Sequence, residues 1–191
     1  MRYFAVAAGI LALAGSMATA QSSTWVSDPM HSEVDFTITH LAISNVHGRF
    51  GKVAATLVYD SADVTKSTVT ATIGVDTVDT GEEPRNNHLK TPDFFDIATF
   101  PTATFTSTSV AKSGTGLVVS GNLTLHGVTK PVVLTVEGPT GPVQGMDKKQ
   151  HAGFSATTTI SRAAFGIGSK FPAAMVGDEV KLSIDLDVAK Q

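Results

Sequence analysis

Three residues near the start of the chain have the side chains of a nucleophilic catalytic triad. Asp28, His31 and Ser32 stand within the five-residue stretch DPMHS. Catalytic triads are assembled in space from separate parts of a chain, so this close spacing carries little information. The chain also lacks the G-x-S-x-G motif of an exposed nucleophilic serine, and it contains no cysteine. We therefore expect these residues to fix the start of the first strand, and we predict no catalytic residue.

Six histidines raise the question of a metal site. They are scattered along the chain, and none belongs to an H-x-H or H-E-x-x-H pair. His40 falls on the apolar face of its predicted strand, where a single histidine is usually a hydrogen-bonded core residue. We predict no metal, although a composite site of His40, His88 and a third group stays open. His126 precedes Gly127, which favours a turn.

A small basic group stands on a short helix predicted near residues 82–90. Acidic residues open this helix, and Pro84 stands early, where its missing N–H does no harm. The group is either a solvated helix face or a polar rim that meets the head group of an amphiphile. We predict a polar rim. It consists of Arg85, His88 and Lys90 on the helix and of one isolated cation elsewhere in the chain, Arg162.

The stretch HLKTPDFFDIATFPTATF, residues 88–105, holds four of the ten phenylalanines and keeps neither a helical nor a strand period. Phe94 and Phe95 are consecutive, so on an extended backbone they point to opposite sides. We predict that one enters a barrel mouth and forms the wall of its entrance, while the other packs under the helix. A strand after Pro101 then carries Phe105. The alternative is a hydrophobic plug that only seals one end.

The ends and the composition of the chain bound its class. Residues 1–20 contain Arg2, a short apolar run and the small-x-small sequence before Gln21, which together are typical of a secretory signal peptide cut near Ala20. We expect a mature domain of residues 21–191, periplasmic or secreted, without a transmembrane segment. The net charge is −3 and no basic cluster appears, which argues against a nucleic-acid partner.

Alternation with period two dominates the rest of the chain. In residues 179–188, Val, Leu and Ile alternate with Glu, Lys, Ser and Asp, which is typical of a strand with one buried face. Such patterns predict strands in residues 33–40, 46–59, 68–75, 102–108, 117–125, 132–137, 151–162 and 179–188. Residues 138–150, rich in glycine and proline, are expected to form a mobile loop. Eight antiparallel strands form a sandwich or a barrel, and closure removes exposed edges.

An eight-stranded barrel is either filled by its side chains or holds one small ligand. The inward faces carry mostly medium-sized aliphatic residues, which favours a cavity. We predict a lining made of the inward strand positions and the phenylalanine stretch: Val34, Phe36, Ile38, His40, Val69, Ile73, Phe94, Phe95, Phe105, Leu123, Leu134, Phe154, Ile160, Leu182 and Ile184.

Several stretches together resemble the YceI-like family of lipocalin-like, polyisoprenoid-binding proteins. They are DPMHSEVDFTITHL at 28–41, VHGRF at 46–50, RNNHLKTPDFFDIATFPTATF at 85–105, GNLTLHGVTKPVVL at 121–134 and ISRAAFGIG at 160–168. Asn86 and Ala164 stand where the family often has acidic residues. Their loss leaves Arg85 and Arg162 without the usual partners, and freer to meet an anionic ligand.

The resemblance implies a single lipocalin-like barrel with an elongated apolar cavity, usually in the periplasm. It also implies a lipid ligand, such as a polyprenyl phosphate or a quinone-type isoprenoid, and no other cofactor. We expect a non-enzymatic carrier or sequestering protein, and the sequence leaves a homodimer open. The alternatives are a stress-related structural or interaction barrel without ligand, and a lipid-modifying enzyme on the same barrel.

Overall fold

The computed structural model describes residues 22–191, so the predicted signal peptide lies outside the described residues. The strands are β1 (Ser22–His40), β2 (Ser44–Phe50), β3 (Val53–Asp60), β4 (Thr68–Gly74), β5 (Thr102–Ser113), β6 (Gly116–Leu125), β7 (Val128–Gln144), β8 (Gln150–Ser161) and β9 (Val176–Lys190). The helices are α1 (Glu83–Leu89) and three 3₁₀ turns, η1 (Val64–Lys66), η2 (Val75–Thr77) and η3 (Ala163–Phe165). Within residues 22–191, no helix has the length and apolar character needed to cross a membrane.

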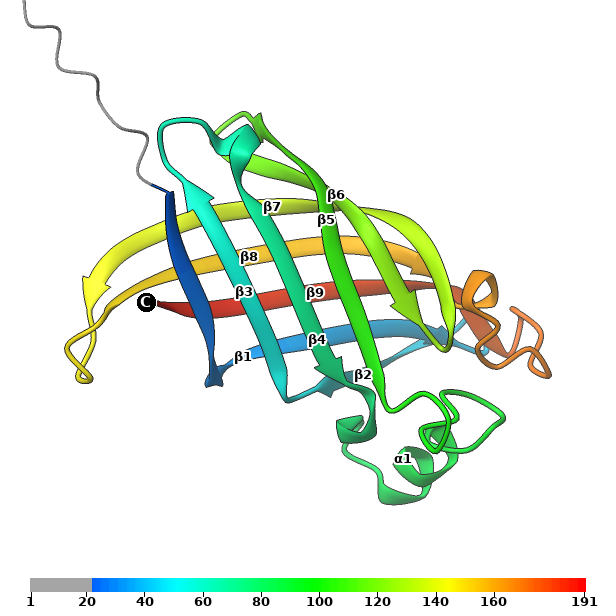
Figure 1. Ribbon diagram of the computed structural model, residues 1–191. Coiled ribbons are helices and arrows are strands. Elements are labelled where there is room, and N and C mark those ends of the chain that lie inside the picture. Colours follow the sequence, from blue (N-terminus) through cyan, green and yellow to red (C-terminus); the bar gives the residue numbers. More distant parts are fainter. Residues whose placement is uncertain (1–21) are drawn as a thin grey trace, which may run out of the picture.

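The strands form an eight-stranded antiparallel closed barrel (Figure 1), which confirms the predicted fold class. Strands β3 to β9 pair in chain order, and β9 closes the barrel by pairing with β1. Strand β3 pairs with residues 22–26 of β1, and β2 pairs with residues 34–40. Segments β2 and β3 therefore occupy one position of the barrel in succession, which corresponds to the single strand predicted over residues 46–59.

One local prediction, the loop at residues 138–150, needs correction. Residues 138–144 do not form a loop, because β7 continues through them and pairs with β8 at Thr140, Val143 and Gln144. The glycine–proline pairs that signalled a turn produce two register shifts in this pairing, and the turn itself lies at residues 145–149. The helix is close to its predicted place, and Pro84 stands in its first turn.

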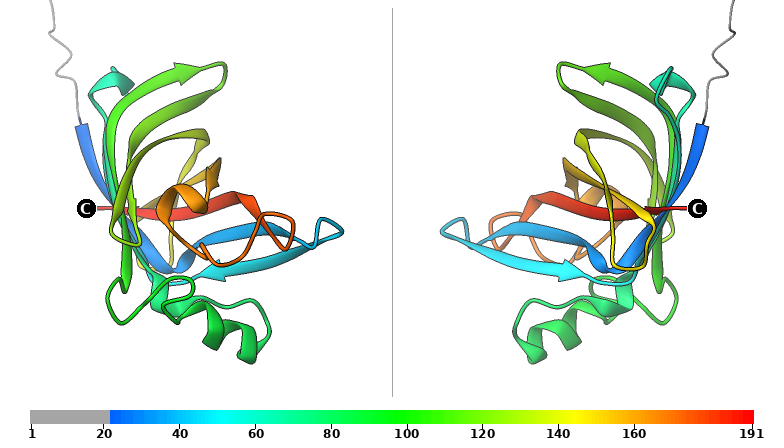
Figure 2. Two further views of the ribbon diagram at one scale, coloured as in Figure 1. Left: turned by 90° about the vertical axis from the view of Figure 1, so that its right-hand side faces the viewer. Right: turned by 90° about the vertical axis from the view of Figure 1, so that its left-hand side faces the viewer.

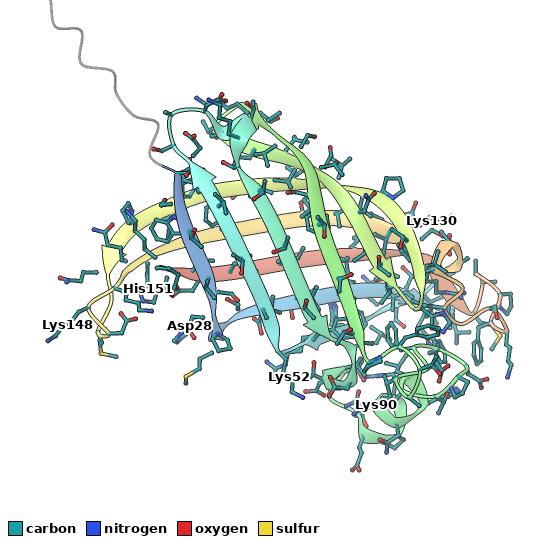
Figure 3. All side chains as sticks on the ribbon, viewed as in Figure 1. Asp28, Lys52, Lys90, Lys130, Lys148 and His151 are labelled. Carbon is teal, nitrogen blue, oxygen red and sulfur yellow. The ribbon has the colours of Figure 1, made fainter. Side chains whose placement is uncertain are left out.

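The two ends of the barrel differ in how they are filled. A compact cluster of Trp25, Ala55, Leu57, Ala152 and Val188 fills the end near the chain termini. In Figure 3, Asp28, Lys148 and His151 mark this filled end, and Lys130 and Lys90 lie at the other end, Lys90 beside α1. At that second end the strands give way to loops instead of a filled core, and we call it the mouth.

A polar network ties the bend in β1 to neighbouring strands at the filled end. Asp28 accepts hydrogen bonds from the backbone N–H of Met30 and from His31 Nδ1, both at 2.8 Å. The Ser32 hydroxyl donates to the backbone carbonyl of Asp187 at 3.2 Å. No bond joins His31 to Ser32 among the described residues, so the three residues of DPMHS form no triad relay. They hold a bend within β1 and do not mark its start.

His151, on β8 at this end of the barrel, lies between two carboxylates. Its Nδ1 is 2.6 Å from Asp187 Oδ1 of β9, and its Nε2 is 3.2 Å from Asp147 Oδ1 in the β7–β8 turn. The hydrogen bond to Asp187, followed by the one to Asp147, raises the pKa of His151 above its ordinary value of 6.5. The imidazolium form is favoured because both ring nitrogens then donate to carboxylates.

We predict that His151→Gln lowers the melting temperature most in mildly acidic solution. A raised histidine pKa gives stability that is complete below the unfolded value of 6.5 and is lost as the pH rises through the folded value. The carboxylate partners must also be ionised, so the deficit should be largest between about pH 4.5 and 6.5 and shrink toward pH 8.5. Melting curves across this range test it, with His47→Gln as control because His47 bonds to the Thr37 hydroxyl. A deficit independent of pH would contradict the prediction.

Candidate ligand-binding cavity

A cavity of about 450 Å³ lies inside the barrel, within the range of small-molecule sites. Aliphatic and aromatic side chains line almost all of it. Every predicted lining residue borders it, namely Val34, Phe36, Ile38, His40, Val69, Ile73, Phe94, Phe95, Phe105, Leu123, Leu134, Phe154, Ile160, Leu182 and Ile184. Contact of these residues with a ligand stays a prediction.

The inward residues of β9 show why the barrel is not simply filled. Val180, Leu182, Ile184 and Leu186 all border the cavity. They are only half-buried, whereas Val188, which belongs to the filled end, is completely buried. The alternation along β9 therefore points the same type of side chain into a solid core at one end and into open space over the rest of the strand.

Sequence reasoning missed part of the lining. Phe50, Val119 and Val136 border the cavity, and the strand period could have identified them. Phe171 and Met175 also border it, but they belong to the irregular segment before β9. No periodic signal marks residues in such a segment, so only the folded structure places them at the cavity.

The prediction that His40 is a core residue was wrong. His40 borders the cavity, but it stands at the exposed end of β1 and not in the core. Alternation predicted an inward position correctly, but it could not show that the strand ends at the mouth. His40 and His88 share no candidate metal group among the described residues.

The charged groups at the cavity have one sign. Among residues 22–191, the Arg, Lys, His, Asp and Glu side chains that border it are Arg85, Arg162, His40 and His88, with no carboxylate. An apolar slot whose border has basic side chains and no carboxylate favours an elongated ligand with an anionic or polar head.

Arg85 is the rim cation with free donors. Its Nε donates to the Thr80 hydroxyl at 2.7 Å, and its Nη2 donates to the Thr80 carbonyl at 2.8 Å. Asn86 fixes Thr80 in turn, because its Oδ1 accepts from both the backbone N–H and the hydroxyl of Thr80. Among the described residues, Arg85 Nη1 has no hydrogen-bond acceptor and no carboxylate lies within ion-pair distance of the guanidinium. Thr80 therefore fixes the guanidinium of Arg85 at the cavity, and N–H donors of the guanidinium remain available to a ligand.

The prediction of a polar rim was wrong for two residues, Lys90 and Arg162. Lys90 does not border the cavity. Arg162 borders it, but the residue is only 5% exposed. Its guanidinium donates to five backbone carbonyls, those of Gly177, Ile167, Gly168, Phe171 and Val176, at 2.7–2.9 Å. Its donors are therefore used to hold the loop between β8 and β9, and none is left for an anionic ligand.

The phenylalanine stretch folds as a turn. Residues 91–95 form turns and not extended backbone, so Phe94 and Phe95 both border the cavity instead of pointing to opposite sides. Phe94 stacks on Phe171 with ring centroids 4.9 Å apart, and His88 packs edge-on against both rings. Phe95 packs edge-on against Phe50 at 5.6 Å.

An ionic contact closes the outer side of this aromatic group. Lys170 and His88 both approach the carboxylate of Asp93. The hydrogen bond from Lys170, and then that from His88, lowers the pKa of Asp93 below its ordinary value. The loop before β9 is thereby joined to the loop after α1 across the mouth.

Within residues 22–191, one group of side chains could hold a metal ion, and it lies away from the cavity. Ligand atoms of Asp28, His31 and Asp187 lie within 4.8 Å of one another at the filled end. The direct hydrogen bond between His31 and Asp28 already uses two of these atoms. That the protein holds no metal stays a prediction.

These features define a class of protein, a closed β-barrel with an internal apolar cavity and a basic border at its mouth. The chain belongs to the YceI-like family, because the YceI-like domain matches residues 25–188, and this confirms the resemblance found in the sequence. A UPF0312 protein of Vibrio cholerae is 35% identical over 170 residues, covering 87% of this chain and 89% of the relative. A UPF0312 protein of Shewanella putrefaciens is 35% identical over 178 residues and 93% of each chain.

Solved structures share the fold. Burkholderia cenocepacia BcnA is 28% identical with a TM-score of 0.72, covering 84% of this chain and 98% of BcnA. The Campylobacter jejuni YCEI protein is 32% identical with a TM-score of 0.71, covering 80% and 90%. A polyisoprenoid-binding domain from Saccharophagus degradans has a TM-score of 0.63 at 17% identity, covering 90% and 100%, and shows a likeness of fold alone.

We predict that Arg162→Lys strongly destabilises the barrel. A lysine ammonium has three donors and cannot reach five carbonyls, so buried acceptors lose their partners at a cost of about 3 kcal/mol in the free energy of unfolding. Urea denaturation measures the loss. Arg49→Lys is the matched control, because Arg49 is exposed and its nearest carboxylate contacts are 3.9 Å long, so its loss should stay below about 0.5 kcal/mol. Similar losses in both variants would contradict this role of Arg162.

Proposed function

We propose that the protein binds a long-chain amphiphilic lipid, of isoprenoid type, with its hydrocarbon in the barrel and its head at Arg85. The observation that carries this proposal is the combination of an apolar cavity with a border that has basic side chains and no carboxylate. Burial of hydrocarbon contributes about 0.8 kcal/mol per CH₂, so few polar contacts are needed. The polyisoprenoid-binding domain from Saccharophagus degradans, which has a similar fold, supports the same class of ligand.

The proposed role is to carry or sequester this lipid, without catalysis. The basic groups at the cavity are two arginines and two histidines, and Asp93, the carboxylate that His88 approaches at 3.5 Å, does not border the cavity. A periplasmic or secreted location, after removal of residues 1–20, rests on the sequence alone. Polyprenyl phosphates and quinone-type isoprenoids are the proposed ligands. Mass spectrometry of an organic extract of the purified protein tests the proposal, because a carrier should release an unmodified lipid.

We predict that Leu134→Asp abolishes retention of lipid. Leu134 borders the cavity, so an aspartate there would place an unpaired charge against hydrocarbon. Thr135→Asp is the matched control, because the neighbouring position is exposed on the outer face of β7. Lipid in the organic extract of each folded variant should be lost in the first and kept in the second. Normal lipid content in folded Leu134→Asp protein would contradict a cavity site.

We also predict that Phe94→Ala and Phe95→Ala have different effects. Phe94 is buried in the stack with Phe171, so its loss should cost about 3–5 kcal/mol in the free energy of unfolding. Phe95 is only half-buried, so we expect a smaller stability cost and a faster release of ligand. Urea denaturation and the dissociation rate of a fluorescent fatty acid measure the two effects. Unchanged dissociation rates in both variants would make the aromatic group a plug and not an entrance.

A further inference from the structure

The mouth carries exposed apolar side chains, and two of them, Leu41 and Ile43, do not border the cavity. We define the mouth loops as residues 41–43, between β1 and β2, and residues 172–175, before β9. Their sequences are LAI and PAAM, without an ionisable residue. Ile43 is 84% exposed, Leu41 is 47% exposed and Met175 is 46% exposed. Large aliphatic side chains at such exposure are costly in water unless something covers them.

The two mouth loops form one structural unit. The backbone N–H of Leu41 donates to the carbonyl of Met175 at 2.8 Å, and Met175 N–H donates to the carbonyl of Pro172 at 2.8 Å. Figure 2 shows the β1–β2 hairpin extending beyond the rest of the barrel, beside the segment before β9. The apolar tip therefore projects as a fixed feature of the fold.

The backbone of residues 41 and 42 has a conformation that asparagine and glycine adopt more easily than leucine and alanine. Leu41 has φ 52° and Ala42 has φ 58°, in the left-handed region where asparagine and glycine are preferred. Leucine at such a position carries a conformational cost and packs into no core. The sequence therefore keeps an apolar side chain where the local fold would accept a polar one more easily.

The apolar surface continues from the tip into the barrel. Met175, Phe171 and Val46 border the cavity, and Met175 also belongs to a mouth loop. Met175 therefore joins the apolar surface of the mouth loops to the lining of the cavity. Behind the tip lies a polar belt, in which Thr39 bonds to Asn45 at 3.3 Å and Thr37 bonds to His47 at 3.0 Å.

We propose that the mouth loops insert into the surface of a lipid bilayer, so that the cavity mouth opens toward the acyl chains. A layered arrangement of an apolar tip and a hydrogen-bonding belt matches the boundary between acyl chains and head groups, at a depth of about 5–10 Å. The use of this docking for lipid transfer rests on the proposed function, but the docking itself does not.

Size and charge favour a bilayer over the alternatives. Loops of three and four residues cannot supply the roughly 20–30 residues a side of a stable protein interface. The chain has a net charge of −3, so anionic head groups would repel it as a whole. Docking is driven by apolar insertion, and neutral phosphatidylcholine vesicles are therefore the appropriate probe.

Flotation of the protein with phosphatidylcholine vesicles tests the proposal. We expect the wild type to float, and Leu41→Asn/Ile43→Ser to lower the partition coefficient about tenfold or more. Asparagine suits the backbone at residue 41, so the variant should fold, and its melting curve checks this. The matched control is Met30→Ser/Met146→Ser, which removes side chains that are 85% and 103% exposed at the filled end. This control should float like the wild type.

A second measurement locates the contact. In Ile43→Trp the added indole should show a blue-shifted emission with vesicles and quenching by brominated acyl chains, while the buried Trp25 should not respond. The proposal is overturned if the wild type does not float, or if the control loses as much binding as the mouth variant. It is also overturned if binding requires anionic vesicles and disappears at about 0.5 M salt.

The experiments can contradict the docking proposal and the lipid-binding proposal independently of each other. Leu134→Asp should lose its lipid but still float, whereas Leu41→Asn/Ile43→Ser should keep lipid in its organic extract but float poorly. Flotation of a wild type that holds no extractable lipid would leave docking standing and overturn the proposed function. If the wild type holds extractable lipid but never floats, the docking proposal is overturned and the proposed function stands.

Discussion

The pairing of β1 with β9 is the constraint on which the rest of the structure depends. It closes the barrel, so no strand edge is left along the seam, and the interior is separated from water. Strand β1 can take part in a barrel of this length only because it bends at residues 28–31 and because β2 and β3 pair with its two parts in succession. The bend places Trp25 in the filled end and Phe36 at the cavity, so one strand contributes both to the solid core and to the open site.

The mouth is built from segments that are irregular in sequence and distant along the chain. Arg162 gathers the loop before β9 around its guanidinium, and Lys170 then joins this loop to Asp93 on the segment after α1. A buried guanidinium is costly to desolvate, and its five carbonyl partners offset that cost only in one arrangement of the loop. The charge that looked like a ligand contact in the sequence thus serves mainly to fix the frame in which Arg85 and the aromatic group are presented.

Sequence pattern was informative where one side of a strand is wet and the other is not. The period of two placed β9 and the inward faces of the other strands, because every second side chain must avoid water there. The sequence pattern did not show that the guanidinium of Arg162 is buried among backbone carbonyls. Every residue type has such a carbonyl, so the partners of Arg162 leave no signal in the sequence. The pattern also failed at residues 138–144, where glycine and proline mark bulges in a continuing strand, and at Phe94 and Phe95, where turns replace extended backbone. Local composition signals an irregularity, but the irregular geometry depends on distant partners.

Glycines explain how a barrel with several inward phenylalanines keeps an open interior. Phe36 faces Gly48 across the β1–β2 pairing, and the ring of Phe105 covers Gly121 on β6; a β-carbon on either glycine would overlap the ring. Each ring therefore lies against the wall, in the space that a neighbouring side chain would otherwise fill, instead of crossing the barrel. The aromatic side chains bury much of their surface in this way and still leave the centre unfilled. An apolar space of this kind, closed by Trp25 and its neighbours at one end, directs any bound hydrocarbon toward the mouth, where the basic border and the exposed apolar loops lie side by side.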